Sequence, residues 1–319
     1  MSCGRHSGVL QTWLTRELGI ALPIVGAPMG GRAGGVLAGE VSRAGGIGML
    51  GAARYTTPEW VERESAIARD LGGRFGVGLM NWALAEDDSL LEAALAAQPT
   101  MVSLSFGDPA PYVGRVHAAG ACAVSQVNTL EDLRQAEAAG VDAVVAQGSE
   151  AGGHTGRIGT LPLLQEVLEA ATVPVLAAGG IGTGRGLAAV LAAGAEGAFI
   201  GTALLASPET IGPDYAVARL LKAESTDTVY TDVFDKARNQ PWPSRWLGRA
   251  IANDFTEEYH EAGRTEEELA AQYDPALPER GVVYAGQIAG LVHDARPVAE
   301  VVSSIARDAE RLLSRFCGM

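Results

Sequence analysis

One histidine stands where an expected buried strand gives way to a helix. In the segment QGSEAGGHTG (147–156), His154 follows Gly152 and Gly153, and an apolar run over residues 141–146 leads into the segment. Small neighbours give an imidazole little to pack against, so we interpret His154 as a residue that contacts a ligand. An imidazole with an ordinary pKa of about 6.5 accepts or donates a proton near neutral pH, as general acid–base catalysis requires.

Glu150 and the other histidines of the chain are interpreted as residues without a catalytic role. Glu150 lies just before the glycines, and a carboxylate at a strand end usually accepts hydrogen bonds from backbone N–H groups, so we predict a structural role for it. The remaining histidines lie in the N-terminal stretch or on polar helical patterns and are interpreted as surface residues: His6, His117, His260 and His293.

Two glycine-rich turns follow the last two expected strands. They read AAGGIGTGRG (177–186) and FIGTAL (199–204), and a helical pattern starts near Gly184. Without side chains, backbone N–H groups can close on an anion, and the positive end of the helix dipole favours negative charge there. A tight turn alone explains one such loop but explains two on consecutive strands poorly. We therefore predict a phosphate site formed by Gly179, Gly180, Gly182, Gly201 and Thr202.

Two other phosphate motifs are disfavoured. No Gly-Lys-Ser/Thr follows the glycines, which excludes a P-loop. The spacing GGIGTG resembles a dinucleotide fingerprint, but such a fingerprint follows the first strand of its unit and not the seventh.

Polar and soft side chains stand at the ends of other expected strands. Asn81, Gln126 and Gln147 each end a strand, and three amides around one mouth can read the edge of a heterocycle through paired donors and acceptors. An amide in such a place also serves to cap a helix. The first strand ends at Ala27, Pro28 and Met29; a methionine there suits contact with a flat ring, although methionine is commonly a core residue.

The elements that must position these residues alternate along residues 23–205. Short apolar runs are separated by amphipathic stretches such as TLEDLRQAEAAG (129–140) and TGRGLAAVLAAG (183–194), each of which ends with a glycine stop. Continuous apolar strands between helices predict a parallel sheet covered on both faces, and eight units predict closure into a (β/α)₈ TIM barrel. An open doubly wound sheet is the structural alternative. The runs are Pro23–Met29, Gly46–Gly51, Arg74–Met80, Met101–Phe106, Ala121–Val127, Ala143–Gln147, Val173–Ala178 and Ala198–Ala203.

The pattern changes after the eighth strand. Residues 207–281 contain the cluster NQPWPSRW (239–246) and an acidic helical stretch, and they are too long for a loop without structure. We predict a mainly helical insertion there, acting either as a lid or as a surface elaboration packed on the barrel. Residues 1–206 and 282–319 are predicted to form the barrel, with closing helices split near Pro297.

Composition excludes several classes of partner. The formal net charge of −14 argues against nucleic acid and anionic membranes. Cys3, Cys122 and Cys317 share no short spacing, which disfavours a disulfide framework or a zinc site, and we expect no bound metal. No signal-peptide pattern or membrane-length apolar run is present, so we expect a soluble cytoplasmic protein, either a monomer or a homodimer.

Taken together, the motifs resemble the nitronate monooxygenase family, the FMN enzymes once called 2-nitropropane dioxygenases. The resemblance extends from PIVGAPMGG through QGSEAGGHTG and the segment around AAGGIGTGRG to YAGQIAGLV (284–292). It implies FMN at the barrel mouth and oxidation of alkyl nitronates, and of some nitroalkanes, with O₂. His154 matches the family's catalytic histidine. The resemblance implies that the isoalloxazine is surrounded by Ala27, Pro28, Met29, Asn81, Gln126 and Gln147, with Gly152 and Gly153 close to it.

Other functions remain as alternatives. An FMN-dependent enoyl-acyl-carrier-protein reductase shares EAGGH and the phosphate loops but needs NAD(P)H and an acyl-thioester groove; Arg238 and Arg245 in the insertion favour it, and the net charge does not. An inosine-monophosphate dehydrogenase needs a cysteine that SEAGGHTG lacks. A flavin-free sugar-phosphate lyase or isomerase usually needs a barrel lysine, but the chain has only Lys222 and Lys236, both beyond strand eight. His154 argues against a non-catalytic flavin-binding protein.

Overall fold

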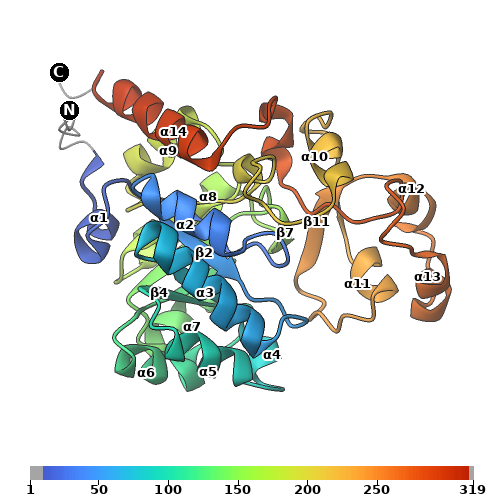
Figure 1. Cartoon of the computed structure of the whole chain (residues 1–319), viewed down its shortest axis with the longest axis horizontal. Coiled ribbons are helices and arrows are strands. Elements are labelled where there is room, and N and C mark those ends of the chain that lie inside the picture. The colour runs from blue at the N-terminus through green and yellow to red at the C-terminus, as the bar shows by residue number, and fades with distance from the viewer. Residues whose placement is uncertain (1–9, 316–319) are drawn as a thin grey trace.

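The structure is a computed structural model that describes residues 10–315. Cys3, His6 and the N-terminal pattern lie outside the described residues, and so does Cys317. Figure 1 shows a barrel surrounded by helices, with a second group of elements (α10 to α13 with β11) standing beside it.

Eight parallel strands close into a barrel. Each strand pairs with the next, and β1 pairs with β9 through Ile24 opposite Ala198, which completes the ring. The predicted (β/α)₈ barrel is therefore confirmed, and the open doubly wound sheet is wrong. The strands are β1 (Ile24–Gly26), β2 (Ile47–Gly51), β3 (Gly76–Met80), β4 (Met101–Ser105), β5 (Cys122–Val127), β6 (Ala143–Gln147), β8 (Val175–Ala178) and β9 (Ala198–Ile200).

Helices surround the strands where the amphipathic patterns predicted them. The helices α7 and α9 end at Gly140 and Gly194, both in the left-handed conformation that glycine adopts without strain. No helix in residues 10–315 is both long and apolar enough to span a bilayer. The helices are α2 (Gly35–Arg43), α3 (Pro58–Gly72), α4 (Asn81–Leu84), α5 (Ser89–Ala96), α6 (Ala110–Ala118), α7 (Leu130–Ala139), α8 (Thr160–Ala170), α9 (Gly184–Ala193) and α14 (Val298–Leu313).

The N-terminal end of the barrel is closed by a short helix. Helix α1 (Trp13–Leu18) inserts Leu14 and Leu18 among the side chains that fill the barrel interior. Leu14 is fully buried, and its neighbours in this cluster include Val25, Leu176 and Phe199. The interior is thus a packed core, and a ligand must bind at the opposite end, where the strands finish.

Replacing Leu14 by alanine is expected to destabilise the barrel by about 2 to 5 kcal/mol, because the site loses buried apolar contacts and keeps a cavity. Urea-induced unfolding followed by circular dichroism measures the change. The control is Leu161→Ala, which removes an exposed side chain of α8 and is expected to change the unfolding free energy little. Equal stability of the two variants would contradict the packing described here.

The segment after the eighth strand contains both helices and strands. It comprises α10 (Asp214–Leu220), β10 (Thr228–Thr231), α11 (Val233–Ala237), β11 (Leu247–Ile251), α12 (Asp254–Tyr259) and α13 (Glu266–Gln272). The two strands, which the periodicity did not reveal, join a third strand, β7 (Gly153–Thr155), in an antiparallel sheet of order β10–β11–β7. The segment has a core of its own that includes Phe234, Phe255 and Leu269. The exact domain boundaries at 206 and 282 stay a prediction.

The chain then returns to the barrel. A short 3₁₀ helix, η3 (Gln287–Leu291), follows the insertion, and α14 then packs against α9 and α2. The closing helices expected after residue 282 are therefore present, and Figure 1 shows α14 beside α9.

Candidate active site

The insertion determines where His154 lies. The strand β7, which carries His154, pairs with β11 so that His154 faces Gly248 in the register. The hydroxyl of Tyr230 on β10 donates to the carbonyl of Thr155 at 2.7 Å. The loop that leaves β6 is therefore held against the insertion as part of a sheet, above the carboxyl ends of the barrel strands.

Gly152 lies against the chain's own backbone. A Cβ on Gly152 would lie 2.6 Å from the backbone of Ala285 and Gly286, so the glycine lets the returning chain pass close to the loop. Gly153 has a left-handed φ of 72°, and a Cβ there would meet nothing within 4 Å. The sequence predicted that these glycines let the backbone pass close to a neighbour. For Gly152, the neighbour in the structure is the backbone of residues 285 and 286. Contact of either glycine with a flavin stays a prediction.

A buried carboxylate holds the imidazole. The His154 Nε2 atom lies 2.8 Å from Oδ2 of Asp235 on α11, and the two residues are only 8% and 3% exposed. The other carboxylate oxygen, Oδ1, accepts a hydrogen bond from the Tyr284 hydroxyl at 3.0 Å and lies 3.4 Å from the Arg238 guanidinium. Arg238 also donates to Tyr284 at 3.0 Å, so the four side chains form one network.

The environment favours the neutral imidazole. Burial lowers the pKa of His154 below its ordinary value; Asp235 opposes this shift, and the nearby charge of Arg238 adds to it. A lowered pKa means that the imidazole is unprotonated at neutral pH, so it can accept a proton there.

Aromatic rings cover the face of His154. The ring of Trp242 stacks on the imidazole with centroids 3.4 Å apart and planes 6° apart. Trp82 and Phe106 each approach Trp242 edge-on, at 5.2 Å and 5.0 Å, and Phe106 also contacts Trp246. Phe106 has a φ of 63°, a strained value for a non-glycine residue, where β4 ends. These rings form an aromatic wall on one side of the mouth.

A hydrogen-bonded chain fixes one of the predicted amides. Asn128 Nδ2 donates to both the carbonyl and the side-chain oxygen of Gln147, at 2.8 Å and 3.0 Å. The Asn128 oxygen in turn accepts from Trp246 Nε1 at 3.0 Å. Gln147 is thereby oriented, with its amide nitrogen left to bind a ligand.

Other polar atoms at the mouth have no partner within residues 10–315. They are Asn81 Oδ1, Gln126 Nε2 and Trp82 Nε1, all of which are buried. Asn81 is 2% exposed, and its amide nitrogen donates to the Gly107 carbonyl at 3.1 Å. A buried polar atom without a partner is costly, so these atoms indicate that a polar ligand completes the site. Two of the three amides that the sequence singled out are among them.

The glycine turns have the backbone geometry of an anion site. Gly179 and Gly180 have φ values of 95° and 70°. A Cβ on Gly179 would lie 2.9 Å from the Gly148 carbonyl, so only glycine fits there. In the described part of the chain, the N–H groups of Gly180, Gly182 and Gly201 make no backbone hydrogen bond in the turns and loops. They are therefore available to a phosphate beside the N-terminus of α9.

The second turn faces the end of the first strand. A Cβ on Gly201 would lie 3.4 Å from Met29 Sδ and 3.5 Å from Ala27 Cβ. The Thr202 hydroxyl accepts from the Gly286 N–H at 2.9 Å and keeps its own proton for a ligand. Pro28 packs over Gly78, where a Cβ would be only 2.3 Å from the proline ring. The structure thus brings Ala27, Met29, Gly201 and Thr202 together, while Pro28 lies toward β3.

Glu150 has the structural role predicted for it. Its Oε2 atom accepts hydrogen bonds at 2.6 Å from both the N–H and the hydroxyl of Thr160, the first residue of α8. A carboxylate there satisfies a free N–H and complements the positive end of the helix. The described surface histidines are also as predicted: His117 pairs with Asp142 on the surface, and His260 and His293 are exposed.

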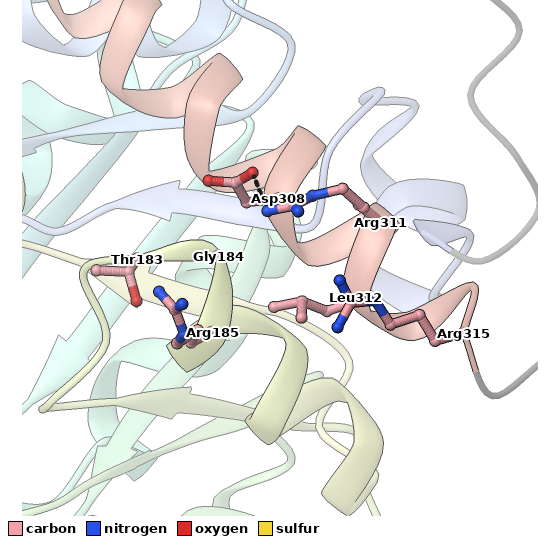
Figure 2. Close-up of a pocket in the computed structure, with 7 residues that line it drawn as sticks. All are labelled: Thr183, Gly184, Arg185, Asp308, Arg311, Leu312 and Arg315. Atoms are coloured by element: carbon pink, nitrogen blue, oxygen red, sulfur yellow. Dashed lines mark hydrogen bonds and ion pairs between the residues drawn. The ribbon is translucent and has the colours of Figure 1, made fainter.

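Two cavities lie outside this site. Figure 2 shows one of about 100 Å³ between the start of α9 and the end of α14, lined by Arg185, Arg315 and the Asp308–Arg311 ion pair. A second, of about 360 Å³, lies behind α4 and is lined by Leu79, Met80, Ala83 and Leu84, with the Arg54–Glu86 ion pair at its rim. No group of His, Cys, Asp and Glu that could hold a metal ion occurs in residues 10–315.

Several site residues were not predicted from the sequence. Trp242 and Trp246 belong to the cluster NQPWPSRW, whose tryptophans were a usable signal. Asp235 and Tyr284 gave none, because each lies far along the chain from His154 and only the fold joins them. Of the two arginines noted in the insertion, Arg238 belongs to the buried network, and Arg245 pairs with Asp132 on the rim.

Comparison with known proteins gives one family match and relatives with two different named activities. A family model described as nitronate monooxygenase matches residues 75–308. The chain is 29% identical to a nitronate monooxygenase of Neurospora crassa, with 92% of this chain and 90% of that protein covered. It is 30% identical to an octahydro-indene-carboxyl-CoA dehydrogenase of Mycobacterium tuberculosis, over 94% of this chain and 96% of that one.

Solved structures agree with this. FabK from Thermotoga maritima matches with a TM-score of 0.84 and 29% identity, covering 97% of this chain and 99% of that one. A nitroalkane oxidase from Streptomyces ansochromogenes matches with a TM-score of 0.79 and 32% identity, covering 95% of this chain and 99% of that one.

Proposed function

The chain belongs to the nitronate monooxygenase family of oxidoreductases, and from this we propose that it oxidises alkyl nitronates with O₂ in an FMN-dependent reaction. One observation carries the proposal: a buried imidazole, whose pKa is lowered by burial, lies at a barrel mouth that also presents unpartnered amide atoms and a glycine-lined anion site. The proposed partners are a small nitronate, or a nitroalkane, and O₂, and we propose a cytoplasmic location.

The residues present fit FMN. Its phosphate would be held by the turns at Gly179, Gly180, Gly182, Gly201 and Thr202, where the N–H groups of Gly180, Gly182 and Gly201 and the Thr202 hydroxyl are available. Gln126 Nε2 and Asn81 Oδ1 would supply a donor and an acceptor for the edge of the ring system, beside Gln147. Met29 and Ala27 give an apolar surface next to Gly201. When bound there, FMN supplies the electron transfer and the reaction with O₂ that no side chain can supply.

His154 performs the proton chemistry in this proposal. With a nitroalkane, the neutral imidazole takes a proton from the carbon next to the nitro group, and the electron pair of the broken C–H bond remains on the nitronate. With a nitronate as substrate, no proton is removed, and the imidazole holds the anion only when it has taken up a second proton. Trp242, which Phe106 contacts edge-on, covers one face of the imidazole and excludes water from it, which strengthens electrostatic interactions at the site.

Similarity to FabK supports the alternative, an FMN-dependent enoyl-acyl-carrier-protein reductase that uses NAD(P)H. It would use the same phosphate turns and the same histidine. The cavity of about 360 Å³ beside α4 is lined by Leu79, Met80, Ala83 and Leu84 together with charged and hydroxyl side chains, and it is a candidate space for an acyl chain.

The two functions differ in the co-substrate that they consume, which is O₂ for the monooxygenase and NAD(P)H for the reductase. We expect the yellow, FMN-loaded protein to consume O₂ with propionate 3-nitronate or ethyl nitronate and to leave NADPH unoxidised in the presence of a crotonyl or hexenoyl thioester. Oxygen-electrode and NADPH-absorbance assays measure the two rates on one preparation. NADPH oxidation dependent on the thioester, without nitronate turnover, would overturn the proposal in favour of the reductase. A purified protein that binds no flavin would overturn both.

A further inference from the structure

We propose that Asp235 is a positioning residue: it holds the Nε2–H of His154 and thereby leaves Nδ1 as the atom that accepts the substrate proton. This inference rests on the proposed function, because it concerns how the same histidine is prepared for the reaction. It adds a residue from the insertion to a site that the barrel otherwise builds.

The contact between the two side chains is made inside the protein. Asp235 and His154 are 81 positions apart in the chain, yet their atoms are 2.8 Å apart, and the side chains are only 4% and 7% exposed. The carboxylate cannot turn away, because its other oxygen accepts from Tyr284 and faces Arg238. The pairing of β11 with β7 holds the backbone on both sides of the contact.

The contact selects one form of the neutral imidazole. An ionised carboxylate only accepts hydrogen bonds, so the nitrogen that faces it, Nε2, must carry the proton. The lone pair of the neutral ring then lies on Nδ1, which makes no hydrogen bond within residues 10–315. Trp242, stacked on the ring face at 3.4 Å, restricts rotation of the ring that would exchange the two nitrogens. A base of known orientation is thereby presented to the substrate.

The charges around the ring predict the effect of removing the carboxylate. Three groups face His154: Asp235 on α11, Arg238 just after α11, and Tyr284 on the returning chain. On the neighbouring strand β11, the charged side chain is Arg249, which binds the Ser149 carbonyl and the Thr228 hydroxyl. Asp235 is the group that raises the pKa of His154; burial and Arg238 lower it. Without Asp235 the pKa of the imidazole therefore falls further, and the neutral form persists to lower pH.

The first experiment is Asp235→Asn in the FMN-loaded enzyme. An asparagine can donate its amide N–H to Nε2 and so favour the other tautomer, with the proton on Nδ1. We expect kcat for a nitroalkane to fall by at least about 10-fold, the lower end of the losses found when a partner that orients a functional histidine is changed, with little change in KM. We also expect the acid limb of the kcat/KM profile to move to lower pH.

The matched control is Asp232→Asn. Asp232 is the residue before α11 and pairs with Lys236, but both side chains are 43% exposed and neither contacts His154. This variant is expected to keep the wild-type rate and pH profile. An Asp235→Asn enzyme with a wild-type rate and acid limb would overturn the proposal while leaving the nitronate activity in place.

A second measurement needs no activity and reads the tautomer in the wild-type protein. Nitrogen-15 NMR of the histidine-labelled wild-type protein reports which ring nitrogen carries the proton, and the His154 signals are identified by their loss in His154→Gln. We expect the His154 Nε2 to be protonated and Nδ1 to be free in the neutral ring. Protonation at Nδ1 would overturn the inference. The expected tautomer in a protein without nitronate activity would instead reject only the proposed function.

Discussion

Replacing His154 by alanine is expected to lower the kcat of nitroalkane oxidation by about 10²- to 10⁴-fold, the usual contribution of a positioned general base. FMN is expected to stay bound, because the atoms proposed to hold it belong to the glycine turns and to the strand ends that carry Asn81 and Gln126. Turnover and the flavin absorbance of the same purified sample give the two quantities.

The type of substrate refines this expectation. A preformed nitronate needs no proton removed, so His154→Ala should impair it less than the corresponding nitroalkane, and the ratio of the two losses measures the base function separately from anion binding. Equal losses with both substrates would show that the imidazole binds the anion and does not act as a base.

Two controls separate catalysis from structure. His154→Ala leaves Asp235 buried without its partner, which costs about 1 to 3 kcal/mol, so His154→Gln is made in parallel because the longer amide can still reach the carboxylate. His117→Ala removes a surface histidine that pairs with Asp142 and is expected to be silent. Loss of the flavin from both His154 variants, with the fold intact by circular dichroism, would contradict a catalytic role and indicate a cofactor-holding one.

Replacing Gly201 by valine is expected to produce a folded protein that binds FMN at least tenfold more weakly and is inactive at ordinary FMN concentrations. The backbone of Gly201 has a negative φ of −112°, so a side chain causes no backbone strain. Its Cβ, however, would point into the space beside Met29 and Ala27, where the flavin is proposed to lie. Two further methyl groups on that carbon would occupy the space and block the N–H groups of the turn.

Equilibrium dialysis against FMN measures the change, and thermal unfolding without FMN measures stability. Gly201→Ala is expected to give an intermediate affinity, because its single carbon makes ordinary contacts at 3.4 Å. Gly114→Val on α6 is the control, since a Cβ there meets nothing within 4 Å and the site is remote from the mouth. Unchanged FMN affinity in Gly201→Val would show that the turn after β9 does not contact the cofactor.

The barrel was predictable from local patterns. Each of the eight apolar runs contains one barrel strand, since a strand buried on both faces shows a continuous apolar sequence. The turns at Gly179 and Gly180 were also predictable, because the barrel geometry places the ends of neighbouring strands together once the strand order is known. The order followed from the chain, as each strand pairs with the next one along it, apart from β7.

The insertion was much less predictable. The short strands β10 and β11 are only partly buried and pair with β7, so neither shows a clear alternation of its own. The role of Gly152 shows the same difficulty. Its neighbour in space is the backbone of residues 285 and 286, and no local pattern reports a contact of that separation.

The sequence by itself therefore determined the fold class and the histidine that stands at the carboxyl end of the barrel, and it predicted ligand binding at that end, since all of these follow from local periodicity and chain order. Only the tertiary structure decided how that histidine is prepared. Asp235 and Trp242 reach it through an antiparallel sheet between distant segments, and the burial that lowers its pKa exists only after that sheet has formed.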